Sequence, residues 1–124
     1  MISKKFRLKE REVKRALQKG KPFFAYNLVL NYCANKLPHN RFAIVISKKS
    51  SKKAVDRNFF RRRFYDKTQK FIGKNKENKY YDFVFVIKTK YKIDKKNTKI
   101  IEEFNRDIDF LFKKIFNNYK KNER

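Results

Sequence analysis

Hydrophobic residues recur with two different periods along the chain, and the change of period marks the predicted elements. Residues 9–19 carry apolar side chains at helical spacing and predict an amphipathic helix. These side chains belong to Val13, Ala16 and Leu17. Gly20 and Pro22 follow directly and predict the end of that helix. Because the apolar stripe is thin, the helix must lie against a larger unit.

The segment after this helix alternates with period two, which is typical of β-strands. One strand is predicted over residues 23–33 and a second over residues 41–47. The polar residues 35–40 between them read as a turn. Two neighbouring strands with a short polar connection predict an antiparallel hairpin.

The second half of the chain predicts a helix, a strand and a further helix. Residues 54–72 form the first of these, ending at Gly73, and the continuous apolar run 80–88 predicts a strand buried on both faces. A strand, a long helix and another strand in this order suggest a crossover, with the last strand parallel to an earlier one. Residues 97–119 close the domain as a helix with a broad apolar stripe. The stripe consists of Ile100, Ile101, Phe104, Ile108, Leu111, Phe112, Ile115 and Tyr119.

The helix predicted over residues 54–72 separates an aromatic face from a polar one. At 100° per residue its buried stripe is formed by Phe60, Phe64 and Phe71. The neighbouring shoulder carries a contiguous polar patch. The patch consists of Arg57, Asn58, Arg61, Arg62 and Tyr65. Like charges four residues apart weaken an isolated helix by about a few tenths of a kcal/mol per pair, so phosphates lying between them would explain the arrangement.

Charge extends the prediction from a fold to a partner. The chain has 36 lysines and arginines against 12 acidic residues, a formal net charge of +24 in 124 residues. Small domains usually carry a net charge of about 2–8, and a polyanion would relieve the self-repulsion of this excess. Because 40% of the residues are hydrophobic and 17% aromatic, a folded single domain is favoured over a disordered basic segment. Nucleic acid is the predicted partner.

The densest positive charge lies in residues 47–65, which contain four lysines and four arginines. The lysines precede the helix, in a predicted loop. They are Lys48, Lys49, Lys52 and Lys53. With the polar patch on the helix, they predict a surface that docks onto folded RNA.

Several other chemistries are excluded by what the sequence contains. Cys33 and His39 are the only cysteine and histidine, so an internal disulfide and a structural zinc site are both excluded. No stretch reaches the ~20 apolar residues of a membrane span, and no signal segment is predicted. We therefore expect a cytoplasmic protein without a membrane partner. A glycine-rich phosphate loop and a catalytic pairing of acids with a histidine are both missing from the pattern.

The stretch 47–65 resembles the signature of the bacterial ribonuclease P protein subunit. The matching residues are S-K-K at 47–49, A-V at 54–55 and R-N-x-x-R-R at 57–62. Weaker matches flank this motif. They are R-L-K at 7–9, Gly20, L-V-L at 28–30 and D-x-V-F-V-I-K from Asp82. The resemblance covers roughly residues 7–115.

The resemblance implies an α/β fold with the element order α-β-β-β-α-β-α. This would be an α+β two-layer sandwich around a central mixed sheet, of the ribosomal-protein-S5-domain-2-like type. The basic helix would make a left-handed crossover between parallel strands, against the usual right-handed rule. The chain would form one domain over residues 1–124, with a basic arm at 1–8 and a frayed tail at 120–124.

The resemblance also implies a function. Members of this family bind the catalytic ribonuclease P RNA, and the complex removes the 5′ leader of precursor tRNA in a Mg²⁺-dependent hydrolysis. The protein would contribute no catalytic residue, and the RNA would hold most of the Mg²⁺. We expect one monomer to bind one RNA.

Two sets of site residues follow from the resemblance. The four loop lysines and the helical patch would bind the catalytic RNA, with Tyr65 standing where the family often has an arginine. A groove between the first helix and the sheet would hold the leader. Val13 and Leu17 replace family aromatic residues there, and a groove tyrosine falls at Asn31. A one-residue bulge would bring Tyr32 to that place instead.

Two alternatives remain open at this point. A ribosomal or other structural RNA-binding protein would share the charge and the small α/β form. A protein-only nuclease would need clustered acids to bind metal ions. A third of the acids lie on the last predicted helix, at Glu102, Glu103, Asp107 and Asp109, which argues against such a cluster.

Overall fold

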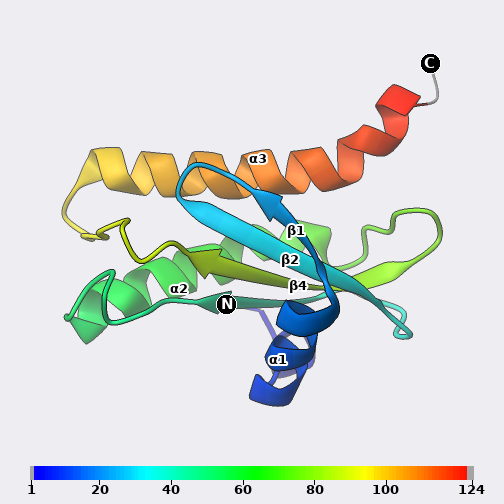
Figure 1. Ribbon diagram of the computed structural model, residues 1–124, viewed down its shortest axis with the longest axis horizontal. Helices are drawn as coiled ribbons and strands as arrows, with labels where there is room; N and C mark the ends of the chain where they lie inside the picture. Colours follow the sequence, from blue (N-terminus) through cyan, green and yellow to red (C-terminus); the bar gives the residue numbers. More distant parts are fainter. Residues whose placement is uncertain (1, 123–124) are drawn as a thin grey trace.

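The computed structural model describes the backbone of residues 2–122 and the side chains of residues 2–116. Helices and strands follow the order α-β-β-β-α-β-α, as the resemblance implied (Figure 1). They are α1 (Glu10–Lys19), β1 (Lys21–Phe24), β2 (Leu28–Asn35), β3 (Arg41–Val45), α2 (Ala54–Thr68), β4 (Tyr80–Ile87) and α3 (Thr98–Asn122). Short 3₁₀ turns, η1 (Lys4–Phe6) and η2 (Gln69–Phe71), precede α1 and follow α2. The tail predicted to be frayed comprises residues 120–124. The backbone is helical up to residue 122, and residues 123–124 lie outside the described part of the chain.

The four strands form one mixed sheet with the order β1-β2-β4-β3. β2 pairs antiparallel with both β1 and β4, whereas β3 pairs parallel with β4. The predicted parallel pairing across the crossover is therefore confirmed, and the left-handedness of the crossover connection stays a prediction. The predicted hairpin between residues 23–33 and 41–47 is wrong, because β4 lies between β2 and β3. β4 is the most apolar strand and lies inside the sheet, where all its residues except Tyr80 and Val86 are buried.

The strand predicted over residues 23–33 is in fact two strands joined by a tight turn. The Ala25 N–H donates to the Leu28 carbonyl at 2.8 Å, and residues 25–27 reverse the chain. Neither glycine nor proline marks this turn. It is held from outside by the Lys88 Nζ, which donates to the carbonyls of Ala25 and Tyr26 at 3.0 Å each. The Asn27 N–H also donates to Asp107 Oδ2 at 2.9 Å.

The two faces of the sheet are covered to different extents. The face toward α2 and α3 carries an aromatic core, and the opposite face packs against α1 through a smaller cluster. That smaller cluster contains Ala16, Ala43 and Val84, with Leu8, Val13, Cys33 and Val86 around it. In Figure 1, α3 runs along the top of the sheet and α1 projects below it. Because α1 is only ten residues long, part of its face of the sheet stays open.

The apolar stripes predicted for the two long helices form the main core. Phe60 and Phe64 of α2 are fully buried, and the stacked pair Phe71–Phe112, with centroids 4.2 Å apart, joins η2 to α3. α2 ends at Thr68 and passes into η2, four residues before the predicted end. The α3 stripe is buried from Phe104 to Ile115, and its last predicted member, Tyr119, lies outside the described side chains.

The N-terminal arm covers the outer edge of β3. Arg7 forms a parallel bridge with Phe42, and the Leu8 N–H donates to the Phe42 carbonyl at 2.9 Å. Ile2 is buried and Phe6 packs against the main core. The arm therefore closes an edge that would otherwise offer unpaired backbone groups.

α1 is joined to the sheet by close packing and by one ionic cluster. The Arg41 guanidinium donates to Asp82 Oδ1 and Oδ2 at 2.9 and 2.8 Å and also pairs with Glu12 of α1. The hydrogen bonds to Asp82 raise the pKa of Arg41 above its ordinary value. For Glu12, burial would raise the pKa, but the Lys9 N–H and the Arg41 charge outweigh it, and the pKa lies below its usual range.

Candidate nucleic-acid interface

The lysine-rich loop between β3 and α2 is ordered by its serines. Ser47 Oγ accepts the Lys49 N–H at 2.9 Å, and Ser51 Oγ accepts the Lys53 N–H at 3.1 Å. Ser50 is buried, and its carbonyl accepts the Ile93 N–H at 3.0 Å from the loop after β4. The serines therefore turn inward and the lysine side chains outward. Lys48, Lys49, Lys52 and Lys53 are all exposed.

Asp56 connects this loop to the first turn of α2. Its Oδ2 accepts the Ser51 hydroxyl at 3.1 Å, and its Oδ1 accepts the Lys95 N–H at 3.1 Å. The Lys95 N–H is the main cause that lowers the pKa of Asp56 below its ordinary value of 3.8. A carboxylate in the first turn also interacts favourably with the helix dipole. Asp56 thereby fixes two lysine-rich loops relative to the start of α2.

Four of the five residues predicted for the polar patch on α2 are exposed or half-buried, and three of these four form hydrogen bonds. Arg57 donates to the Ser51 carbonyl at 2.8 Å, and Arg61 donates to Asn58 Oδ1 at 2.9 Å. Asn58 and Arg62 are exposed, whereas Arg57 and Arg61 are half-buried. These bonds hold the guanidinium planes in place while leaving other N–H groups to donate outward. Such a preorganised set suits phosphate oxygens and base edges.

Tyr65 does not belong to this patch. It is only 7% exposed, its ring packs edge-on against Phe64 at 5.2 Å, and Arg7 lies over it at 6.0 Å. Its burial raises the pKa of the phenol. The prediction that Tyr65 lies on the exposed shoulder is wrong, because the N-terminal arm and β3 extend the buried sector of α2 beyond the phenylalanine stripe. The helical wheel could not include these neighbours.

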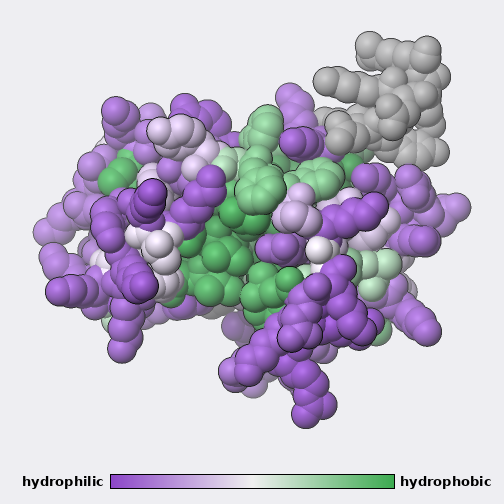
Figure 2. Space-filling view, in the orientation of Figure 1, coloured by the Kyte–Doolittle hydropathy of each residue, from purple (hydrophilic) through white to green (hydrophobic). Residues whose placement is uncertain are grey.

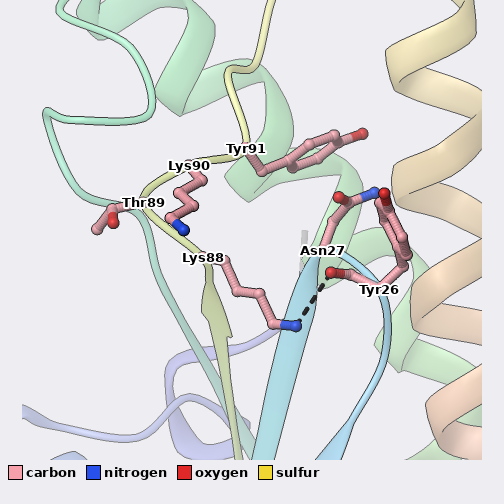
Figure 3. Close-up of a pocket in the computed structure, with 6 residues that line it drawn as sticks. All are labelled: Tyr26, Asn27, Lys88, Thr89, Lys90 and Tyr91. Atoms are coloured by element: carbon pink, nitrogen blue, oxygen red, sulfur yellow. Dashed lines mark hydrogen bonds between the residues drawn. The ribbon is translucent and has the colours of Figure 1, made fainter.

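The basic surface extends to a second loop, between β4 and α3, to which the sequence assigned no site. Lys90 and Lys92 line one cavity of about 720 Å³ together with the exposed lysines Lys48, Lys49 and Lys52. A neighbouring cavity of about 700 Å³ lies between the same loop and the turn after β1 (Figure 3). Figure 3 shows Lys90 and Tyr91 on the loop side and Tyr26 and Asn27 on the turn side. The available signal was the alternating lysine run K-T-K-Y-K directly after the strand.

The residues predicted for the leader groove divide between the two faces of the sheet. Val13 packs against the sheet on the α1 face, and Leu17, one helical turn later, is 41% exposed. Asn31 pairs with Val84, whose side chain also lies on the α1 face of the sheet. Next to them an apolar row crosses all four strands in register and is not covered by α1. The row consists of Phe24, Val29, Val86 and Val45. Figure 2 shows an open hydrophobic surface in the centre of the molecule, between α3 and α1.

Tyr32 lies on the wrong side of the sheet for this groove. It belongs to the main core, 8% exposed, between Phe23, Tyr81 and Phe83. The register from Leu28↔Ile87 to Asn35↔Tyr80 is continuous, so the bulge that would have turned Tyr32 toward α1 is not formed. The prediction of Tyr32 as a groove residue is therefore wrong, and Asn31 is the β2 residue on the groove side.

Four acidic side chains of the described chain hold parts of the fold together. Glu12 and Asp82 bind Arg41, Asp56 binds the two loops, and Asp107 holds the β1–β2 turn. Among the residues that the structure describes, no three His, Cys, Asp or Glu side chains come together in a group that could hold a metal ion. Among the described helices, none is long and apolar enough to cross a membrane.

Comparisons with known proteins agree on one family. The model of the family described as Ribonuclease P matches residues 2–117. A Staphylococcus aureus RNase P protein, a mutant with defective mRNA degradation activity, is similar in structure with a TM-score of 0.69. It is 23% identical over 89% of this chain and 87% of its own. The Thermotoga maritima RNase P protein has a TM-score of 0.58 and 25% identity, over 93% of this chain and 96% of its own. A search of curated proteins gave no significant match.

Proposed function

Because this chain belongs to the ribonuclease P protein family, we propose that it binds the catalytic ribonuclease P RNA through α2 and its basic loops. In the same complex, the groove beside α1 would bind the 5′ leader of precursor tRNA. The RNA would carry out the endonucleolytic cleavage that creates the mature 5′ end. The proposed complex contains one protein per RNA and works in the cytoplasm.

The observation that carries this proposal is the set Arg57, Asn58 and Arg61, ordered by hydrogen bonds beside a wall of exposed lysines. Lysines and arginines neutralise phosphates and release counterions, which gives strong, salt-sensitive affinity. The fixed guanidinium planes suit the phosphates and splayed bases of a folded RNA. A purely solvated charged face would not need its arginines held by hydrogen bonds to the Ser51 carbonyl and to Asn58.

The groove supports the second half of the proposal. Val29, Val86 and Val45 offer an apolar floor beside α1, and α1 itself carries exposed cations. A single strand can lie on such a floor without its sequence being read, because every base has an apolar face. By holding both the catalytic RNA and the leader, the protein would raise the affinity of the complex for precursor over mature tRNA.

Mg²⁺ is assigned in this proposal to the RNA. The described residues do not assemble an acidic cage, and the Asn58 amide oxygen already accepts from Arg61. The proposed work of this chain is to bind and position the two RNAs.

Reconstitution tests the proposal. Protein alone, the ribonuclease P RNA of the same organism alone, and both together are given precursor tRNA at low Mg²⁺ and moderate salt. We expect no cleavage by the protein alone and strong enhancement of the RNA by the protein. Cleavage by the protein alone, or no enhancement, would overturn the proposal.

The docking face has its own test in the double variant Arg61→Ala/Arg62→Ala. Loss of charged hydrogen bonds should weaken RNA affinity about tenfold or more, and the salt slope of binding should fall by roughly 1–2. Lys36→Ala, an exposed cation in the turn between β2 and β3, is the matched control. Equal affinity and slope for the double variant and the control would show that α2 is not the docking face.

The groove is tested by Val13→Phe, which adds an aromatic ring beside the apolar row. The reconstituted complex should then bind precursor tRNA more tightly, because stacking of a leader base on an aromatic side chain adds about 1–3 kcal/mol. Mature tRNA, which has no leader, is the control substrate. Unchanged precursor affinity would count against the placement of the leader beside α1.

A further inference from the structure

Exposed aromatic side chains gather where the edge strand β1 meets α3. Phe24 is 60% exposed and Phe110 is 50% exposed, although most aromatic rings of this chain are packed in the core. Phe23, next to Phe24, packs against the core from the same strand. The Lys114 Nζ lies 5.3 Å from the Phe23 centroid and 5.8 Å from the Phe110 centroid, so one cation joins β1 to α3. We call Phe23, Phe24, Phe110 and Lys114 the aromatic edge.

The aromatic edge continues the open sheet face around β1. Successive residues of a strand point to opposite faces, so Phe23 faces α3 while Phe24 faces the α1 side. Phe24 pairs with Val29 and is thus the last member of the apolar row that crosses all four strands. The hydrophobic surface in Figure 2 accordingly reaches from the open sheet face up to α3. A chain lying on this row would leave the sheet over Phe24 and meet Phe110 and Lys114.

Charge decides which kind of partner fits this surface. Lys114 stands between two rings, and Arg106 and Lys113 line a shallow cavity next to Phe110. Two acids, Glu102 and Asp109, line the same cavity, and Asp109 is paired with Lys67 at 3.0 Å. A second copy of the chain would bring a net charge of +24 against +24, which opposes self-association. Exposed rings interleaved with cations suit single-stranded RNA, in which bases stack and phosphates pair.

We propose that the aromatic edge binds unpaired nucleotides of a long 5′ leader, beyond those that lie in the groove beside α1. The inference rests on the proposed function and adds a second segment of the same substrate. The bases stack on Phe24 and Phe110, and Lys114 contacts the backbone between them. Precursors with long, unstructured leaders therefore bind more tightly than precursors whose leader ends within the groove.

The test compares two precursors bound to the complex reconstituted with its ribonuclease P RNA. One has a short leader and the other a long, unstructured leader. The variant Phe110→Ala, which leaves the apolar row beside α1 intact, should lose about fivefold or more in affinity for the long-leader precursor, since each stacked base contributes about 1–3 kcal/mol. Its affinity for the short-leader precursor should stay unchanged. Lys114→Gln keeps the rings and should lower the salt slope for the long leader by about 1.

Leu37→Ala, which removes an exposed apolar side chain from the turn between β2 and β3, is the matched control. Equal loss for both precursors would overturn the proposal, because it would indicate damage to the groove or the fold. Equal affinity of wild type and Phe110→Ala for the long-leader precursor would also overturn it. So would a change of oligomeric state with unchanged leader affinity, which would identify a self-association surface. If wild type itself enhances cleavage of neither precursor, the proposed function fails, which is a separate and distinguishable result.

Discussion

At the scale of single residues, Asn40 shows how one buried polar side chain joins three elements. Its Nδ2 donates to the carbonyls of Phe71 and Lys74 at 2.7 Å each, and its Oδ1 accepts the Tyr81 N–H at 2.7 Å. Asn40 is fully buried at the start of β3, between the end of η2 and the start of β4. From the sequence it was merely the last residue of a polar turn.

Asn40→Ala should therefore be strongly destabilising. The substitution leaves the buried Tyr81 N–H without its partner and removes one hydrogen bond from each of the Phe71 and Lys74 carbonyls, at a cost on the order of 3 kcal/mol. The melting temperature should fall by roughly 10 °C. Thermal unfolding of the free protein measures this, with Asn58→Ala on the exposed face of α2 as the control. A change below about 0.5 kcal/mol, as expected for the control, would show that water replaces the lost bonds.

Gly20 is a second residue whose role only the structure reveals. A helix C-cap glycine was expected from the sequence, and Gly20 is the C-cap, but its φ of −78° is open to any residue. Glycine is required at this position because backbone atoms of Ala16 and Tyr32 lie too close to leave room for a Cβ atom. A Cβ would lie 2.4 Å from the Ala16 carbonyl oxygen and 2.9 Å from the Tyr32 carbonyl oxygen.

Gly20→Ala should accordingly destabilise the protein by about 1–3 kcal/mol, because backbone atoms of α1 and β2 must move apart. Gly73→Ala is the matched control, since a Cβ there meets nothing within 4 Å. That control should be neutral or stabilising by about 0.4–1 kcal/mol. Chemical unfolding of both variants measures the difference. Equal stability of the two would refute the close-approach explanation.

At the scale of elements, Asp56 couples α2 to the loops on either side of it, and this coupling should depend on pH. Its folded pKa lies below the ordinary value of 3.8. A carboxyl group whose pKa is depressed on folding contributes stability above its unfolded pKa and loses it as the pH falls through the folded pKa. The stability supplied by Asp56 is therefore complete above about pH 5 and decreases below about pH 4.

Asp56→Asn should then be less stable than wild type near neutral pH, and the difference should shrink as the pH falls toward about 3. Melting temperatures of both proteins across this range provide the measurement. Glu10→Gln, at an exposed position on α1, is the control and should differ little from wild type throughout. A difference between wild type and Asp56→Asn that grows on acidification would contradict the assigned direction.

At the scale of the whole molecule, the net charge of +24 means that the folded protein repels itself. Twelve acids cannot neutralise 36 cations, whatever pairs they form. Raising the salt concentration screens this repulsion, with the screening length falling from about 30 Å at 0.01 M to about 10 Å at 0.1 M. The melting temperature of the free protein should therefore rise with added salt. A melting temperature that falls would show that attractive ion pairs outweigh the repulsion, and an uncharged osmolyte controls for water activity.

The chain by itself determined the type and approximate position of the long elements, because hydrophobic period is a local property of consecutive residues. The stripes of Phe60 and Phe64 on α2 and of Phe104 to Ile115 on α3 are buried as predicted. The sequence also predicted that Arg57, Asn58 and Arg61 lie close together, since residues three and four apart share a helix face. The resemblance supplied the α-β-β-β-α-β-α order. The periodicity alone had predicted a single strand where the structure has both β1 and β2.

Only the tertiary structure decided which elements are neighbours, because pairing depends on residues far apart in the chain. β4 entered between β2 and β3, and the turn at Tyr26 was set by Lys88 and Asp107 rather than by a local turn residue. Other contacts between distant parts of the chain bury Tyr65 beneath the N-terminal arm and Tyr32 in the main core. A helical wheel or a strand alternation says which side chains share a side, but what covers that side is supplied by the rest of the fold.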